Sequence, residues 1–325
     1  MSLKFQKLFS ASEIKAAWHL IETSRNFVLL GHQDPDRDTV FACLAMAELL
    51  SSLNKPNITV IFPNKPCFRL PKTSAKVLFG RHKIQPDLIL TFDAPVRQRL
   101  YFPPEFANTP VINVDHHLDN QIGGQCNFVD INACSACEVL ARLILDWDPK
   151  LLTATLSQLL LVGILDDSFV FKTQQSGYSA LFTTLKLIDA GANFNKAKAL
   201  VANYKTPGVA KLWANLMAQG QVLAQERLFL MVLNAAQCAQ KDFSVAALEG
   251  VVNFVASIVN CDIVVLLREL VPGKIKCSLR SKQTDVKSIA AQFGGGGHKY
   301  ASGFSIDNAD LTKISQRLVS SVQKT

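Results

Sequence analysis

Four short apolar runs in the first third of the chain limit the folds that are open to it. They cover residues 27–30, 58–62, 88–92 and 111–114. Each run is nearly continuous in apolar residues, as in strands that are buried on both faces, and helical or loop segments separate them. This alternation predicts an α/β fold with a mainly parallel sheet and helices on both faces. In such a sheet, ligands bind at the carboxyl ends of the strands.

Three of these runs end in residues that bind metal ions in proteins. Residues 27–30 lead into the segment 31–38, which contains one histidine and three aspartates, while Asp93 follows the third run and residues 115–117 follow the fourth. Parallel strands would bring these groups to one edge of the sheet, where so many carboxylates and imidazoles need cations between them. Asp and His also serve as turn formers and caps, which explains any one strand end better than three together.

The types of ligand indicate the metal and the chemistry. Carboxylate oxygen with imidazole nitrogen, and no cysteine in the set, favours Mn²⁺, with Mg²⁺ or Co²⁺ as less specific alternatives. Two divalent ions can lower the pKa of a shared water and stabilise in-line displacement at phosphorus. The sequence therefore indicates hydrolysis of phosphoesters or phosphoanhydrides. A further acidic pair, Asp166 and Asp167, follows an apolar run, and taken alone it is more typical of a helix cap or turn.

A second, smaller α/β domain is expected after a linker at residues 195–210, where the periodic pattern weakens and Pro207 and Gly208 occur. The first domain would then cover residues 1–194 and the second residues 211–325. In the second domain we expect strands at 228–233, 263–267 and 275–279, and helices at 245–259, 286–293 and 309–322.

The second domain also carries candidate phosphate ligands. Glycines at 294–297 precede His298, and backbone amides of such a run can approach an oxyanion closely, although a flexible surface loop is the alternative. Arg280 stands at the end of an expected strand and could bind phosphate, but a single arginine is more often an ordinary surface residue. In the first domain, the connection 64–86 has six Lys or Arg and no acid. It could attract polyanions, and a solvated face is the more common explanation.

Composition is consistent with a folded, cytoplasmic protein. The 325 residues, 49% of them hydrophobic and 18% charged, can bury the cores of two domains. No apolar run reaches the roughly 18 residues of a membrane span, and the first residues show no export signal. The eight cysteines are then expected as reduced thiols, with the C-x-x-C pair Cys134 and Cys137 as buried small residues rather than a zinc or redox site. The formal charge of +8 suits an anionic partner.

Three motifs, in this order along the chain, resemble the DHH phosphoesterase family with its DHH-associated C-terminal domain, DHHA1. They are H-x-x-P-D-x-D at 32–38, D-H-H at 115–117 and G-G-G-H at 295–298. The resemblance covers nearly the whole chain and is strongest to the stand-alone nano-RNase (oligoribonuclease) and pAp phosphatase branch of a RecJ-like superfamily. It implies that a DHH catalytic, metal-binding domain precedes a DHHA1 substrate-binding domain.

The resemblance also implies a role for each candidate residue. Two Mn²⁺ ions would share Asp93 as a bridging ligand. Asp115 would orient the histidine pair, and His117 would lie beside the scissile phosphate, where it stabilises charge or protonates the leaving oxygen. The remaining ligands would be His32 and Asp36 for one ion and Asp38, His116 and Asp167 for the other, while Arg280, Gly295, Gly296, Gly297 and His298 would bind substrate phosphate.

The function implied by the resemblance is that of a Mn²⁺-dependent phosphoric ester hydrolase of the 3′(2′),5′-bisphosphate nucleotidase type. It would hydrolyse short oligoribonucleotides (nano-RNA), linear dinucleotides such as pApA, and pAp, with a metal-activated water in a cleft between the domains. No membrane and no obligate protein partner is expected, and a homodimer is compatible with the pattern. Two alternatives are a polyphosphate or pyrophosphate hydrolase that uses the same site and a non-catalytic nucleotide sensor. The glycine–histidine segment disfavours the first, and the complete set of ligands disfavours the second.

Several positions depart from the motifs of the family. Arg37 stands where glycine is usual between the two aspartates, which adds bulk and positive charge beside the metals. Asp166 and Phe169 stand in a fourth motif that usually reads T-D-T-G, and its alignment makes Asp167 the ligand. Cys134 and Ala136 replace residues of a segment that is usually rich in hydroxyl groups. These departures remove no ligand and bear on the choice of substrate.

Overall fold

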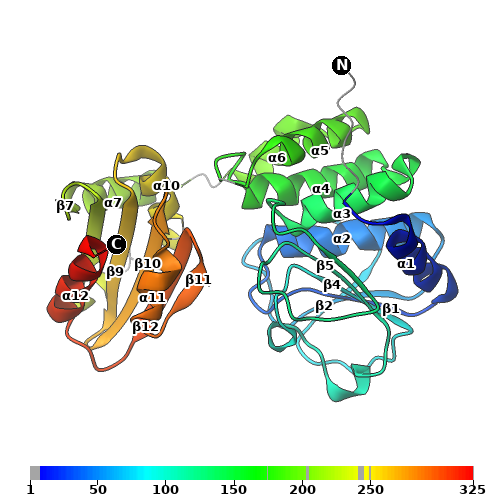
Figure 1. Ribbon diagram of the computed structural model, residues 1–325, viewed down its shortest axis with the longest axis horizontal. Coiled ribbons are helices and arrows are strands. Elements are labelled where there is room, and N and C mark those ends of the chain that lie inside the picture. Colours follow the sequence, from blue (N-terminus) through cyan, green and yellow to red (C-terminus); the bar gives the residue numbers. More distant parts are fainter. Residues whose placement is uncertain (1–7, 174, 203–204, 241–244, 249, 325) are drawn as a thin grey trace. The chain divides into compact units, whose positions relative to one another are not determined.

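The computed structural model describes residues 8–173, 175–202, 205–240, 245–248 and 250–324 (Figure 1). The chain divides into two compact units, Met1–Ala202 and Asn203–Thr325. The division lies within residues 195–210, which the sequence analysis treats as a linker. Much of that segment is helical, because α6 (Phe194–Val201) ends the first unit and α7 (Pro207–Ala218) begins the second.

The N-terminal unit is built on a six-stranded sheet in which every pair of neighbouring strands is parallel. The four apolar runs form four of its strands, as predicted. Two edge strands were not predicted, because their residues are only partly buried and their apolar contrast is weak. In spatial order the strands are β3 (Lys76–Phe79), β2 (Ile58–Phe62), β1 (Phe27–Leu30), β4 (Leu88–Phe92), β5 (Val111–Asp115) and β6 (Cys126–Val129).

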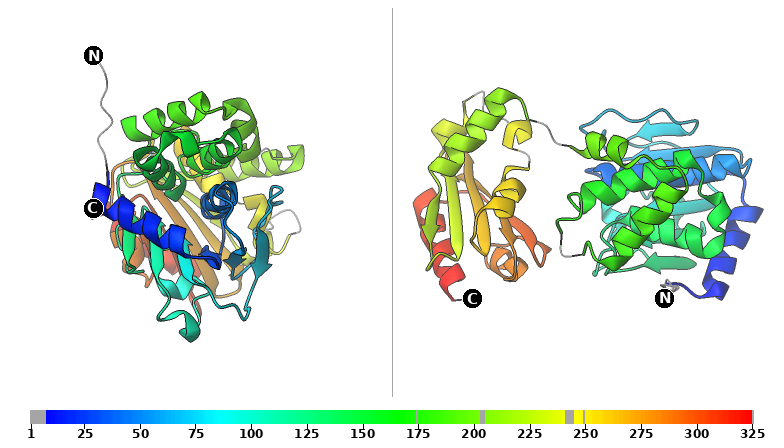
Figure 2. Two further views of the ribbon diagram at one scale, coloured as in Figure 1. Left: turned by 90° about the vertical axis from the view of Figure 1, so that its right-hand side faces the viewer. Right: turned by 90° about the horizontal axis from the view of Figure 1, so that it is seen from above.

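The α-helices of this unit all lie on one face of the sheet, with α2 and α3 next to it and α4, α5 and α6 beyond them (Figures 1 and 2). The prediction of helices on both faces is wrong in this respect. Residues 94–124 cover the other face and place Leu100, Phe106 and Ile122 against it, with short 3-10 helices at Arg97–Arg99 and Pro104–Phe106. Prolines, four of them between positions 95 and 110, prevent a longer helix there. The helices are α1 (Ala11–Thr23), α2 (Arg37–Ser52), α3 (Ala136–Trp147), α4 (Ala154–Asp167), α5 (Tyr178–Asp189) and α6.

The order of the strands creates a place for a ligand between β1 and β4. From β1 the chain crosses to β2 on one side, whereas from β4 it crosses to β5 on the other side. Right-handed crossovers in opposite directions leave the sheet on opposite faces, so the loops after β1 and β4 separate from each other. The motif at 32–38 and Asp93 follow these two strands, at the switch point of the topology.

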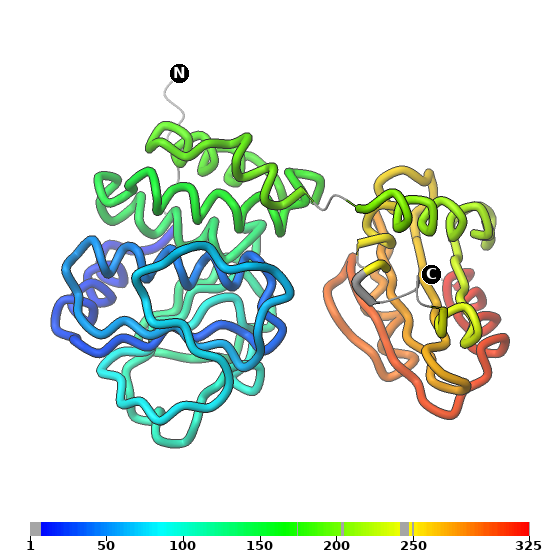
Figure 3. Tube along the Cα trace, turned by 180° about the vertical axis from the view of Figure 1, so that it is seen from behind, coloured from blue at the N-terminus to red at the C-terminus, as the bar shows by residue number. Residues whose placement is uncertain are grey.

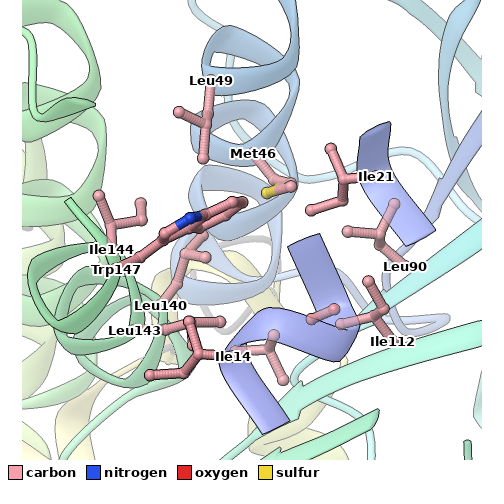
Figure 4. Close-up of a pocket in the computed structure, with 12 residues that line it drawn as sticks. Ile14, Ile21, Met46, Leu49, Leu90, Ile112, Leu140, Leu143, Ile144 and Trp147 are labelled. Carbon is pink, nitrogen blue, oxygen red and sulfur yellow. The ribbon is translucent and has the colours of Figure 1, made fainter. Parts of the chain in front are cut away.

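A small apolar cavity lies between α1, α2, α3 and the sheet (Figure 4). Its volume is about 20 Å³, and its lining includes Ile14, Met46, Leu90 and Trp147. Apart from the indole nitrogen of Trp147, the side chains of the lining are apolar, so the cavity offers a water few hydrogen-bond partners. It is a packing gap in the core and is too small to hold a nucleotide.

The C-terminal unit has a six-stranded mixed sheet, in which β8 and β9 are parallel and the other neighbours are antiparallel. Helices α7 and α10 (Val251–Ile258) pack on one face and α11 (Val286–Ala291) and α12 (Leu311–Gln323) on the other (Figures 2 and 3). The short helices α8 (Ala235–Cys238) and α9 (Val245–Leu248) precede α10. The strands in spatial order are β11 (Gly296–His298), β12 (Ala301–Ile306), β10 (Lys274–Ser281), β9 (Ile263–Val271), β8 (Leu228–Leu233) and β7 (Gln221–Leu223).

The predicted fold class, two α/β domains with a mainly parallel sheet in the first, is confirmed. Strands β8, β9 and β10 include the predicted runs, whereas β7, β11 and β12 were not predicted. The expected helix at 245–259 is interrupted at Gly250, whose φ of +83° suits glycine. Within the described residues, no helix combines the length and the apolar character that a membrane crossing requires.

Cys134 and Cys137 are buried and free, and burial raises the pKa of both thiols. No group of candidate metal ligands among the described residues contains a cysteine. The C-x-x-C pair therefore has the environment of buried small side chains.

Candidate metal centre

The carboxyl edge of the parallel sheet collects the predicted metal ligands of the N-terminal unit. His32 and Asp36 follow β1, Asp93 follows β4, and the D-H-H residues end and follow β5. The helices supply two further acids, Asp38 from the first turn of α2 and Asp167 from the last residue of α4. One group of possible ligands combines His32, Asp36 and Asp93, another combines Asp38, His116 and Asp167, and a third combines Asp93, Asp115, His116 and His117; ligand atoms within each group lie within 4.8 Å of one another.

The distances between these atoms fit ligands of a shared ion better than hydrogen bonds. Nε2 of His32 lies 3.6 Å from Oδ2 of Asp36 and 3.4 Å from Oδ2 of Asp93. Nε2 of His116 lies 3.3 Å from Oδ1 of Asp93 and 3.5 Å from Oδ2 of Asp167. Two ligand atoms that are each about 2.1 Å from an ion, at angles of roughly 90–110°, lie about 3.0–3.5 Å apart. The residues present therefore fit divalent cations.

Asp93 belongs to two of these three groups and lies between His32 and His116. Its Oδ2 faces His32 and its Oδ1 faces His116, and Thr39 Oγ1 donates a hydrogen bond of 2.5 Å to Oδ2. The side chain is buried, and the backbone of Asp93 has a φ of +54°, in the left-handed region that few residues other than glycine adopt. Strained backbone of this kind is concentrated at functional sites, and here it turns the carboxylate away from the strand toward both imidazoles.

Asp38 is held by the N-terminus of α3. Its Oδ2 accepts a hydrogen bond of 2.6 Å from the amide of Ala136, and its Oδ1 accepts one of 3.0 Å from the amide of Cys137. Burial and the nearby charge of Asp93 nevertheless raise the pKa of Asp38 to about 7. A divalent cation beside this carboxylate would favour its ionised form.

Gly163 on α4 leaves room for this arrangement. A Cβ added there would overlap Cys137 Sγ and lie 2.8 Å from Asp38 Oδ1. We expect Gly163→Ala to destabilise the protein by about 1–3 kcal/mol in denaturant unfolding, as overpacking does, and to reduce bound metal by displacing Asp38. Gly208→Ala is the matched control, because that exposed helical position has space for a methyl group and should retain both stability and metal. Unchanged unfolding and metal content in the Gly163 variant would contradict the packing described for Asp38.

Among the D-H-H residues, His116 has the position of a metal ligand. Asp115 and His117 have the positions of supporting groups. His117 Nδ1 lies 2.7 Å from Asp115 Oδ1, a hydrogen-bond distance, and 3.6 Å from Asp93 Oδ1. Asp115 is fully buried and also accepts a 2.8 Å hydrogen bond from the amide of His116 and one of 2.5 Å from Asn120 Nδ2. Asp115 therefore contacts the imidazole of His117 but only the backbone amide of His116, whose Nδ1 lies 3.3 Å from the carbonyl oxygen of Ala133.

The charges of the metal-free site are balanced by protons on the imidazoles. Burial lowers the pKa of His32, but its contacts with Asp36 and Asp93 outweigh burial and raise this pKa to about 9. The pKa of His116 is likewise raised despite burial, chiefly by Asp93. Burial acts in the opposite direction on Asp93 and raises its pKa, yet the two imidazoles outweigh burial and hold this pKa well below the usual range.

These pKa values predict that metal binding releases protons. At pH 7 His32, with a pKa of about 9, carries a proton that a cation must displace, so the apparent affinity for metal should rise with pH up to about 9 and fall at lower pH. Calorimetric titration with Mn²⁺ in two buffers of different protonation enthalpy measures the number of protons released. Binding with no proton release at pH 7 would show that the imidazoles are already neutral.

Two of the predicted phosphate-binding residues of the C-terminal unit, Arg280 and His298, lie on one face of its sheet. Arg280 on β10 pairs with Ala301 on β12, and Ala301 pairs with His298 on β11, so the side chains of Arg280 and His298 project from the same face. Arg280 Nε donates a 2.5 Å hydrogen bond to Asn253 Oδ1, while His298 is exposed.

The glycine run is in part an edge strand, β11, and not only a loop as its glycines suggest. Gly296 and Gly297 pair with β12. A Cβ at Gly295 would overlap Gly303 O, and one at Gly297 would lie 2.6 Å from Ala301 O. Close approach to β12 thus explains these two glycines without a ligand.

The structure adds residues to the site that the motifs do not indicate. Thr91 Oγ1 donates a hydrogen bond to Asn113 Oδ1 (2.8 Å), and Asn113 Nδ2 donates one to Asn120 Oδ1 (3.1 Å). Because Asn120 in turn donates to Asp115, these hydrogen bonds connect β4 and β5 with Asp115. A guanidinium nitrogen of Arg99 lies 3.5 Å from His32 Nδ1. Polar residues inside the otherwise apolar runs 88–92 and 111–114 are the signal that could have indicated Thr91 and Asn113.

Comparison with known proteins gives matches over both units. A model of the DHH family, N-terminal domain, matches residues 26–164, and one of the DHHA1 domain matches residues 227–324. The bifunctional oligoribonuclease and PAP phosphatase NrnA of Thermus thermophilus is 25% identical over 304 residues, which cover 90% of this chain and 88% of that protein. The protein of the same name from Mycoplasma genitalium is 24% identical over 313 residues, covering 91% and 93%.

Solved structures show the same fold. An exopolyphosphatase-related protein from Bacteroides fragilis superposes with a TM-score of 0.87 at 21% identity, over 98% of this chain and 99% of that one. RecJ from Thermus thermophilus, solved in complex with Mn²⁺, superposes with a TM-score of 0.57 at 14% identity, over 99% of this chain and 56% of RecJ. The chain therefore belongs to the DHH family, with a DHH domain in its N-terminal unit and a DHHA1 domain in its C-terminal unit.

Proposed function

We propose that this protein is a Mn²⁺-dependent hydrolase of short oligoribonucleotides, of linear dinucleotides such as pApA, and of pAp. The observation that carries the proposal is the pair of ligand groups that meet at Asp93. Family membership supports phosphoric ester hydrolysis as the reaction. The substrates are proposed because full-length relatives are named as oligoribonucleases and PAP phosphatases.

His32, Asp36 and Asp93 would hold one divalent cation, and Asp38, Asp93, His116 and Asp167 the other. Mn²⁺ is proposed because imidazole nitrogen and carboxylate oxygen make up the whole set. When bound, the cations supply positive charge that lowers the pKa of a water and stabilises the displacement at phosphorus. The protein residues fix the position of that charge, since each ligand group joins loops or helix ends from separate elements.

His117 is proposed to move a proton or stabilise charge at the scissile phosphate. Asp115 accepts the hydrogen bond from Nδ1 of His117, which selects the tautomer of a neutral ring or stabilises a charged one. Nδ1 is engaged by this hydrogen bond although it also lies 3.6 Å from Asp93 Oδ1. In the DHHA1 domain, Arg280, His298 and the amides of Gly295, Gly296 and Gly297 are proposed to bind a substrate phosphate.

One parallel assay tests the proposal. Metal-loaded protein is incubated with pAp, pApA, cyclic di-AMP, a short RNA and polyphosphate, and the products are separated by chromatography. We expect AMP from pAp and mononucleotides from pApA and the short RNA. Hydrolysis of polyphosphate alone would identify a phosphoanhydride hydrolase, and a folded, metal-loaded protein that leaves every substrate intact would contradict enzymatic activity of this kind.

A further inference from the structure

In the sequence, Arg37 lies between the candidate metal ligands Asp36 and Asp38. Its side chain is held by residues from two other parts of the N-terminal unit. Its Nη1 lies 3.2 Å from Asp166 Oδ1, and its guanidinium carbon lies 4.8 Å from the centroid of the Phe68 ring. Asp166 precedes the ligand Asp167 at the end of α4, whereas Phe68 belongs to the basic connection between β2 and β3. The guanidinium is thus held against the C-terminal end of α4, at the residue that precedes the candidate ligand Asp167.

This position is unfavourable for a cation that has only a structural role. Arg37 is the first residue of α2, where the helix dipole presents positive charge and acidic side chains are preferred. Its ion pair is partly exposed, with 30% of the Arg37 side chain and 24% of the Asp166 side chain accessible, and such pairs contribute little to stability. No acidic residue occurs from 64 to 86 to balance it further.

The guanidinium retains capacity to bind an anion. It has five N–H donors in a planar fork, and within the described residues one hydrogen bond, to Asp166, engages them. Phe68 and Asp166 restrict its rotation, so a ligand would cost little additional side-chain entropy. Phosphate is the ligand that a planar, pre-oriented guanidinium beside a phosphoesterase site suits best.

We infer that Arg37 binds a second phosphate of the substrate, next to the phosphate that is hydrolysed. This inference rests on the proposed function and narrows it: the preferred substrates carry phosphate on both the 5′ and the 3′ oxygen of one ribose, as pAp and pApA do. Asp166 and Phe68 are positioning residues, because they act on substrate only through Arg37. The contact is made in the ground state and in the transition state alike, so its loss appears mainly in KM.

Two matched pairs of substrates isolate the second phosphate. pAp differs from 3′-AMP, and pApA differs from ApA, by one 5′-phosphate. We expect Arg37→Ala to lower kcat/KM for pAp and pApA by about 10- to 100-fold, the value of a charge-assisted hydrogen bond, and to change kcat/KM for 3′-AMP and ApA by less than about threefold. Arg37→Lys should recover part of the loss, because it keeps the positive charge without the planar fork. Asp166→Asn should give a smaller loss of the same selectivity, because it keeps Arg37 but removes the carboxylate that positions the guanidinium.

Arg25→Ala is the matched control. It removes the same charge from an exposed residue that precedes β1, at the opposite edge of the sheet from the metal centre, and it should leave all four substrates unaffected. Metal content is measured in every variant. Equal losses on both members of a pair, or loss of bound Mn²⁺ from the Arg37 variants, would overturn the inference and assign Arg37 to the packing of α2 against α4.

A binding measurement separates failure of this inference from failure of the proposed function. Dissociation constants for pAp and 3′-AMP are measured with Ca²⁺ in place of Mn²⁺. Tighter binding of pAp that disappears in Arg37→Ala supports the phosphate site even if the wild-type protein hydrolyses neither nucleotide, in which case only the proposed function fails. Hydrolysis of both pairs by the wild-type protein, without selective loss in Arg37→Ala, leaves the proposed function intact and removes the role of Arg37.

Discussion

Asp93→Asn is expected to abolish hydrolysis and to leave the protein without its pair of metal ions. The two oxygens of Asp93 face His32 and His116 separately, so this one carboxylate connects both ligand groups. Replacing it with an amide removes a negative charge from each group. We expect kcat/KM to fall by about 10³-fold or more, equivalent to several kcal/mol of transition-state stabilisation, and elemental analysis to find little bound Mn²⁺.

Asparagine is the informative substitution because it tolerates the left-handed backbone that Asp93 adopts, with its φ of +54°. Circular dichroism and the unfolding midpoint should show that the variant remains folded. Arg280→Ala provides the comparison, since it would remove one phosphate contact and reduce kcat/KM by about 10- to 100-fold without loss of metal. Equal turnover by the two variants at saturating substrate would contradict the role assigned to Asp93.

His117→Ala is expected to lower kcat by about 10²- to 10⁴-fold, the range of general acid–base catalysis, while both metal ions remain bound. The reason is the hydrogen bond of 2.7 Å between His117 and Asp115, which engages Nδ1, so the ions would be held by the other proposed ligands. Steady-state kinetics and elemental analysis of bound metal measure these two quantities.

His116→Ala is the matched comparison for this prediction. It truncates the neighbouring imidazole, which lies 3.3 Å from Asp93 and 3.5 Å from Asp167, and it should lose metal together with activity. The two variants therefore have opposite expected metal contents. If His117→Ala is isolated without metal, His117 is a ligand, and its proposed action on the scissile phosphate is wrong.

The pairing of Arg37 with Asp166 shows what the sequence could not reveal. Each residue departs from a motif of the family, 129 positions apart from the other, and the sequence gives no sign that they meet. Their contact follows from the packing of α2 against α4. Likewise, Thr39 and Asn120 reach Asp93 and Asp115 only because the ends of separate elements converge.

The strands in the interior of the parallel sheet could be predicted from the sequence, because burial makes their sequences almost entirely apolar. The runs that became β1, β2, β4 and β5 are nearly continuous in apolar residues, whereas β3, β6 and β11 lie at or near sheet edges and carry weaker patterns. We predicted α-helices on the face of the sheet that residues 94–124 cover, because in most parallel sheets α-helices connect the strands. Prolines in the crossover from β4 to β5 decided otherwise.

The sequence by itself determined the family, the fold class and the residues from which a metal centre would be assembled, because these depend on local patterns and on motifs that are contiguous in the chain. The roles of those residues remain predictions for the experiments above. Only the tertiary structure decided which oxygens of Asp93 face which imidazole, how Asp115 holds His117, and where the guanidinium of Arg37 lies. These are relations between segments distant in sequence, and their distances are set by the topology of the sheet and by helix packing rather than by any local preference.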